Sequence, residues 1–427
     1  MKVFRLKKRI LGAGVWILVV IGTLLLFEGF LITFNLFPPR YEYGEPDLGW
    51  APLMPGKINQ GTCTDESSGQ RISILQNELG IRTGVGVDEL RSDRESFKIA
   101  VVGDSQTALC APNSQTHPGV LEEVMREQRR KVQVLSYGQG RYSPLQDYLL
   151  FKRRLKQFNP PALVMNFYTG NDFYDMLRVD DRPHFVKSEA GYEVHPPIWY
   201  RYEDPYKDHT SRILFIVRSL AKFAGVENLS ARLRFLLSVA TQQNQGLHKV
   251  VSYANDLRAS LEPEVGYPEA FAAQILNQQI FFHHFPNSRE ESIQRVRFLL
   301  QMIRRENPGM LLIMSPIPSY QLVQQKPIDH TFVRTIARMP FTYEDGLQQE
   351  EELYYSLKAM ADDLGWLFID NLTPLRNFNG NERLYNNFDY HLTPAASKVI
   401  GMNEAEVLSK YLNSHLDDRG SPLLSRS

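Results

Sequence analysis

Short apolar runs alternate with longer amphipathic stretches from Phe97 almost to the end of the chain. A run of β-branched and other apolar residues without a turn residue predicts a buried strand, and a longer stretch with helical periodicity predicts a helix. The predicted strands are 98–103, 132–135, 162–168, 310–314 and 366–369, and the predicted helices are 118–129, 145–157, 289–306, 348–364 and 394–412. Strands that alternate with helices indicate a parallel sheet covered on both faces. We therefore expect an α/β fold of about five parallel strands in a flavodoxin-like, three-layer arrangement.

A long stretch, 179–288, interrupts this alternation. It contains apolar stretches with helical spacing at 213–223, 229–239 and 271–282. So long a segment is not a plain loop in a compact domain. We expect a helical cap beside the strand ends, whose apolar faces either pack on one another or meet an acyl chain or a membrane surface.

The N-terminus carries a basic cluster followed by an apolar run. Lysines and arginines fill much of 1–9, and the 18 residues from Ile10 to Phe27 bear no charge. At about 1.5 Å per residue they span about 27 Å, close to the hydrocarbon thickness of a bilayer. We predict an uncleaved transmembrane anchor with a cytoplasmic N-terminus and the remaining chain outside the cytoplasm. A cleaved signal peptide is the alternative.

The predicted chain organisation follows from these patterns. Segment 1–40 is the basic segment and anchor, 41–96 connects and caps, 97–178 and 289–416 form the two halves of the core around the insertion 179–288, and 417–427 is a tail. Within the connecting segment, Arg82 either packs on the sheet edge or contacts an anionic group.

The charge balance and the cysteines argue against a nucleic-acid-binding protein and against a metal site built from cysteines. The 427 residues include 48 Lys and Arg against 48 Asp and Glu, so no net field favours nucleic acid. The two cysteines, Cys63 and Cys110, lack metal-ligand spacing. They are either free or joined by one disulfide outside the cytoplasm.

The first predicted strand ends abruptly in Gly103-Asp104-Ser105. The carboxyl edge of a parallel sheet is where ligands bind, and a serine there has the exposed, fixed hydroxyl that a nucleophile needs. Three further polar blocks follow in order: Ser136 to Tyr142 after the second strand, Gly170-Asn171-Asp172 after the third, and Asp389-Tyr390-His391 before the last helix. Alone, each block is also typical of a turn or a helix cap.

A serine hydroxyl needs a base, and His391 is the candidate. Asp389 is close enough in the chain to orient the imidazole. The oxyanion formed on attack needs hydrogen-bond donors, which the Asn171 side chain and the backbone of the Gly138–Arg141 loop offer.

Together, these four blocks resemble the SGNH/GDSL hydrolase family over about Phe97 to Leu412. The resemblance implies that Ser105 is the nucleophile, that His391 is the base, and that Asn171 and a loop glycine, Gly140, donate to the oxyanion. It implies neither metal nor cofactor. Membrane-anchored members often carry stretches like Leu48-Gly49-Trp50 and Asn77 to Arg82.

The chain departs from the family pattern in three places. Asp389 stands two residues before His391 instead of three, Ser136 occupies a position that is often Asn, and the glycine of the second block aligns with Gly140 or with Arg141.

The sequence thus predicts a membrane-bound serine esterase that cleaves an acyl ester through an acyl-serine intermediate. The alternatives are an O-acyltransferase acting on an envelope glycan or lipid, and a catalytically silent envelope-binding or scaffold protein. The G-x-S-x-G, P-loop and H-E-x-x-H motifs of other enzyme classes are absent from the sequence.

Overall fold

The computed structural model describes most of the core and parts of the N-terminal segment. The described residues are 71–128, 131–178, 182–189, 191–197, 286–324, 343–386 and 390–415, together with 43–45, 48–51, 59–64 and a few residues between 16 and 27. The three predicted cap helices, the tail, most of the predicted anchor and Asp389 lie outside these residues.

Five parallel strands form the central sheet, as predicted. They are β5 (Phe97–Gly103), β6 (Val132–Gly138), β7 (Ala162–Tyr168), β10 (Leu311–Ile317) and β11 (Leu367–Phe368), hydrogen-bonded in the order β11-β10-β7-β5-β6. Counted along the chain, this is the flavodoxin-like order 2-1-3-4-5, whose ligand crevice lies where the winding direction reverses. That reversal is between β5 and β7, at whose carboxyl ends Ser105 and Asn171 follow.

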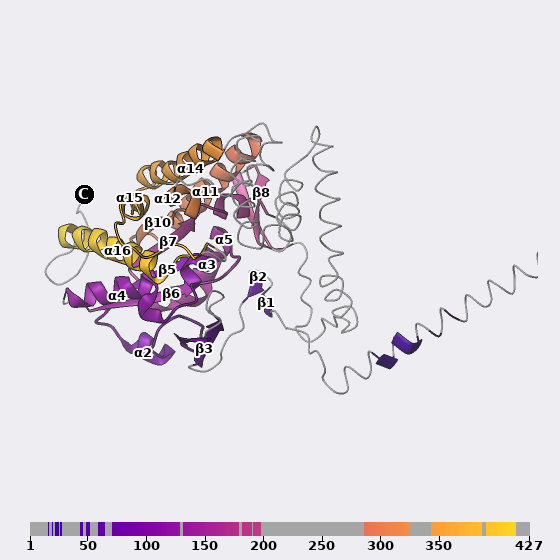
Figure 1. Ribbon diagram of the computed structural model, residues 1–427, viewed down its shortest axis with the longest axis horizontal. Helices are drawn as coiled ribbons and strands as arrows, with labels where there is room; N and C mark the ends of the chain where they lie inside the picture. Colours follow the sequence, from indigo (N-terminus) through magenta and orange to yellow (C-terminus); the bar gives the residue numbers. More distant parts are fainter. Residues whose placement is uncertain are drawn as a thin grey trace, which may run out of the picture.

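Helices cover both faces of this sheet (Figure 1). The residues Ile99 and Val101 of β5 pack toward α4 (His117–Glu127) and α16 (Pro394–His415). The alternate residues Ala100 and Val102 pack with α5 (Pro144–Leu150), α11 (Pro286–Glu306) and α14 (Tyr343–Asp363). Successive strand residues face opposite sides, so a strand this apolar is buried on both faces. The predicted three-layer α/β/α core is confirmed.

Short helices complete the core at the strand ends. They are α2 (Val87–Ser92), α3 (Ser105–Ala108), η1 (Asn113–Gln115), α6 (Asp172–Asp175), α12 (Tyr320–Gln324) and α15 (Leu372–Arg376). The predicted helix 145–157 is α only to Leu150, and then continues as the π turn η2 (Phe151–Leu155) and the 3-10 turn η3 (Lys156–Phe158). Asn159 ends it in a left-handed conformation, with φ 49°.

Near its start the insertion contains a β-hairpin, which the sequence pattern did not reveal, and its last residues, 286–288, already belong to α11. Strands β8 (His184–Ser188) and β9 (Gly191–His195) pair antiparallel. Phe185 and Tyr192 of this hairpin pack on Phe298 of α11, with ring centroids 5.2 and 5.4 Å from it. The insertion therefore begins by packing on the core rather than leaving it at once.

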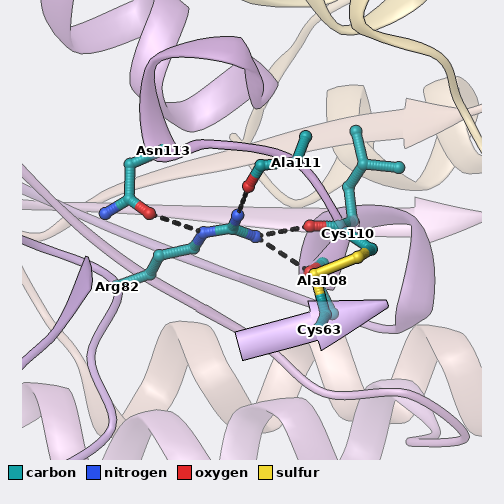
Figure 2. The surroundings of a disulfide bond; sticks show 7 residues. Cys63, Arg82, Ala108, Cys110, Ala111 and Asn113 are labelled. Atoms are coloured by element: carbon teal, nitrogen blue, oxygen red, sulfur yellow. Dashed lines mark hydrogen bonds between the residues drawn. A yellow bond between two sulfur atoms is a disulfide. The ribbon is translucent and has the colours of Figure 1, made fainter. Parts of the chain in front are cut away.

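Two further hairpins precede the core. Strand β1 (Tyr43–Glu45) pairs with β2 (Gly49–Ala51), and β3 (Asn59–Thr64) pairs with β4 (Arg71–Gln76). Cys63 of β3 forms a disulfide with Cys110, which follows α3, over a Cα–Cα distance of 5.8 Å (Figure 2). The sequence left open whether the two cysteines are free or joined; in the structure they are joined.

Arg82 lies beside this disulfide, with its guanidinium among backbone carbonyls and Asn113 (Figure 2). Its guanidinium donates to the carbonyls of Ala108, Leu109 and Ala111 and to Asn113 Oδ1. Burial lowers the pKa of Arg82 to about 10. Arg82 therefore fastens the chain that leaves α3, through three backbone carbonyls and Asn113.

The described residues include no helix that is both long and apolar enough to traverse a bilayer.

Candidate active site

Ser105 lies at the carboxyl end of the central strand β5 and opens α3. Asp104 caps this short helix, because its carboxylate accepts a 2.9 Å hydrogen bond from the Gln106 N–H. Asp104 and Gln106 are buried, whereas Ser105 between them is partly exposed. The turn therefore holds the serine hydroxyl at the surface on a buried, hydrogen-bonded support.

The loop after β6 runs against the serine. Gln139 N–H donates to the Gly103 carbonyl at 2.9 Å, which ties the loop to the end of β5. A Cβ built on Gly140 would lie 3.8 Å from Ser105 Cβ, so the Gly140 backbone passes directly beside the nucleophile candidate. Among the described residues, the amides of Gly140 and Arg141 donate to no backbone carbonyl. Either can therefore serve as an oxyanion donor.

Asn171 follows β7, the neighbour of β5. Its Nδ2 donates a 2.9 Å hydrogen bond to Asp175 Oδ2, one turn ahead in α6. Asp172 Oδ2 accepts a 2.7 Å bond from the Tyr168 N–H and so closes the turn between strand and helix. Thr169 Oγ1 in the same turn donates at 2.6 Å to Glu350 of α14, which is itself buried.

His391 is far from Ser105 in the sequence, but its loop contacts the short helix that Ser105 begins. The next residue, Leu392, donates its N–H to Gln106 Oε1 at 2.9 Å. A backbone bridge between Tyr385 and Leu392 shapes the loop. The charge of His391 also acts on the buried Asp104 carboxyl and opposes the rise in its pKa. The structure thus brings the loop of His391 onto α3, next to Ser105.

Ser105, Gly140, Asn171 and His391 are therefore gathered at one edge of the sheet. Asp389 is not among the described residues, so its predicted role in orienting His391 stays a prediction.

A cluster of buried carboxyl groups beneath this edge escaped the sequence analysis. Asp104, Asp147, Asp172 and Asp175 are each at most 4% exposed and interact electrostatically with one another. Burial raises the pKa of Asp104 to about 6, and it raises the pKa of Asp147 and of Asp172 well above the usual range. Arg182, also buried, forms an ion pair with Asp175, with Nη1 2.8 Å from Oδ2.

No single motif identifies this cluster, because its four carboxyl groups come from three separate segments: the start of α3, α5 and α6. The clue available in the sequence was the density of acidic residues after β7, where Asp172 and Asp175 flank an apolar pair.

Within the described part of the chain, no three His, Cys, Asp or Glu side chains are arranged to hold a metal ion.

Comparison with known proteins gives likeness in structure only. No family profile matches the sequence, and no curated protein matches it. Solved structures similar to this chain include a Desulfitobacterium hafniense protein described as lipolytic and of the G-D-S-L family (10% identity, 73% of this chain and 99% of that one, TM-score 0.31). Others are a lipase/acylhydrolase from Enterococcus faecalis (8% identity, 74% and 96%, TM-score 0.30) and a lipase from a goat rumen metagenome (10%, 73% and 97%, TM-score 0.35).

The chain is similar in structure to lipolytic and acylhydrolase proteins, including one of the G-D-S-L family.

Proposed function

We propose that this protein is a serine ester hydrolase of the SGNH type, with Ser105 as its nucleophile. The observation that carries the proposal is that the loops of Gly140 and His391 both meet α3 at the partly exposed Ser105. A catalytically silent binding domain has no need for an exposed serine, an imidazole and free backbone amides at one strand end.

In the proposed reaction, the Ser105 hydroxyl attacks the ester carbonyl while His391 takes its proton. The resulting oxyanion receives hydrogen bonds from the Asn171 side chain and from the Gly140 or Arg141 amide. His391 returns the proton to the leaving alcohol, and an acyl group remains on Ser105. Water activated by His391 then attacks the acyl-serine and releases the acid, which regenerates the serine.

We further propose that the domain acts outside the cytoplasm and is held by the predicted anchor at its N-terminus. The Cys63–Cys110 disulfide supports this location, since disulfides persist in oxidising compartments and are rare in the cytosol. The basic residues before the apolar run favour the same orientation.

The full-length protein in detergent, treated with a fluorophosphonate probe and digested for mass spectrometry, tests the nucleophile. We expect the label on Ser105 and none on a folded Ser105→Ala variant. Hydrolysis of p-nitrophenyl acetate should be lost in the same variant. A folded wild-type protein that takes no label, or turnover that survives Ser105→Ala, would refute the proposed function.

A further inference from the structure

A single carboxylate oxygen joins the candidate oxyanion donor to the buried acidic cluster. Asp175 Oδ2 accepts the 2.9 Å hydrogen bond from Asn171 Nδ2 and lies 2.8 Å from Arg182 Nη1. The side chains of Asp175 and Arg182 are only 4% and 5% exposed. Water therefore hardly screens this contact, and its geometry is fixed by the fold.

The Asn171 amide nitrogen carries two hydrogens. The bond to Asp175 uses one of them and fixes the rotation of the amide, so the other is left to point at a substrate oxygen. A fixed donor stabilises a developing oxyanion without the cost of reorganising at the moment of reaction.

A bare carboxylate in this position would also work against the reaction. Its negative charge, one hydrogen bond behind the donor, would repel the negative charge that forms on the substrate. Arg182 forms its ion pair with the same oxygen that accepts from Asn171 and so compensates that charge. The field of Arg182 also reaches Asp147, whose two carboxyl oxygens have no hydrogen-bond partner among the described residues.

We propose that Asp175 and Arg182 are positioning residues for the oxyanion site: Asp175 holds the Asn171 amide in its donating orientation, and Arg182 neutralises the carboxylate that does so. This inference rests on the proposed function. It also gives the hairpin at the start of the insertion a part in catalysis, because Arg182 comes two residues before β8.

The opposite charges of Arg182 and Asp175 allow a specific test, because the effect of removing one charge should be reversed by removing the other. With p-nitrophenyl acetate and the full-length protein, we expect Arg182→Gln to lower kcat about 10- to 100-fold with KM within about twofold, a smaller loss than the about 10²- to 10³-fold that follows removal of an oxyanion donor itself. In Arg182→Gln the Asp175 carboxylate keeps, among the described residues, only the longer ion pair with Arg178, 3.8 Å from Nη1 to Oδ1. Adding Asp175→Asn removes that carboxylate charge while keeping an acceptor for Asn171. We expect it to restore at least about tenfold of the lost kcat.

Two controls separate this effect from a general loosening of the fold. Glu291→Gln breaks a comparable ion pair, between Glu291 Oε1 and Arg295 Nε at 2.9 Å, and the contact of Glu291 with Lys187 of the same hairpin. It touches no proposed site residue, so kcat should stay within about twofold of wild type. Arg182→Lys keeps the charge and should lose less kcat than Arg182→Gln, and circular dichroism reports the fold of each variant.

A second cycle asks whether Asp175 acts through Asn171. Asp175→Ala should lower kcat in the wild-type background and change it little in an Asn171→Ala background, because the donor is already gone. Equal kcat for Arg182→Gln with and without Asp175→Asn, or independent effects of Asp175→Ala and Asn171→Ala, would overturn the positioning role alone. A folded wild type that fails to label at Ser105 would instead overturn the proposed function, and this inference with it.

Discussion

Gln106 and Leu392 stand 286 positions apart in the chain and share a 2.9 Å hydrogen bond, from the Leu392 backbone N–H to Gln106 Oε1. Each is the immediate neighbour of a candidate catalytic residue, Ser105 in one case and His391 in the other. Both residues are buried, so this bond holds the loop of His391 against α3 out of contact with water.

Replacing Gln106 by Met keeps the length of the side chain and removes the acceptor. The buried Leu392 N–H then loses its partner, which costs about 1–3 kcal/mol. We expect kcat for p-nitrophenyl acetate to fall about tenfold or more, with a slower rate of fluorophosphonate labelling at Ser105. A variant that labels at the wild-type rate would show that the loop of His391 is held by other contacts.

The two glycines of the second block should respond differently to alanine. A Cβ at Gly138 would lie 2.3 Å from the Ala108 backbone nitrogen, whereas one at Gly140 meets only Ser105 Cβ at 3.8 Å. Gly138→Ala must therefore displace α3. We expect the variant to lose several kcal/mol in the free energy of unfolding, because an added methyl group that meets backbone atoms overpacks the core.

Gly140→Ala should fold with nearly wild-type stability, because 3.8 Å is an ordinary contact distance. Thermal unfolding of both variants, followed by circular dichroism, checks the contrast. Equal melting temperatures for the two variants would contradict the close approach of Gly138, at the end of β6, to α3.

The Cys63–Cys110 disulfide should make stability depend on the redox state. The bridge joins residues 47 positions apart, and closing a loop of this size stabilises a fold by about 2–4 kcal/mol. We expect a reductant to lower the melting temperature of the wild type and to leave a Cys63→Ser/Cys110→Ser variant, already less stable, unchanged. Thiol titration of the denatured protein should find no free thiol before reduction; two at that stage would exclude the bridge.

The buried acidic cluster should make the fold less stable as the pH rises. The pKa of Asp147 is raised well above its usual range because burial penalises the charged form. Between the unfolded and folded pKa values, the folded state therefore holds a proton that the unfolded state has released. The free energy of unfolding then falls with rising pH by up to about 1.4 kcal/mol per pH unit for each such group.

Asp147→Asn removes this ionisation while preserving the shape of the side chain. We expect the variant to be more stable than wild type at pH 8 and to differ little from it near pH 4, as measured by urea unfolding at both values. A wild-type stability that rises between these values, or an Asp147→Asn variant that loses stability at pH 8, would contradict the electrostatic account.

The sheet was predictable because its strands are continuous apolar runs ended by glycine or polar residues. Val101 and Val102 could be assigned to a buried strand without knowing which face each covers. The gathering of Ser105, Asn171 and the loop of His391 also followed, since parallel strands present their carboxyl ends at one edge.

The parts that escaped prediction depend on contacts between distant segments. The β8–β9 hairpin is short, and Val186 and Val194 in it are exposed, so its pattern carried no clear strand signal. The partnership of Arg182 with Asp175 depends on the path of the chain after α6. The hydrogen bonds from Arg82 to backbone carbonyls could not be predicted either, because every residue has a carbonyl and the sequence does not show which one an arginine will reach.

The reach of the last helix sets an order of assembly during synthesis. The helix α16 packs on α4, and the loop that precedes α16 brings His391 to α3. A nascent chain that has exposed Ser105 but not yet residues 390–415 possesses the proposed nucleophile without its proposed base. In the proposed mechanism, a chain truncated before residue 390 therefore has an inactive Ser105, however well the strands of its sheet have folded.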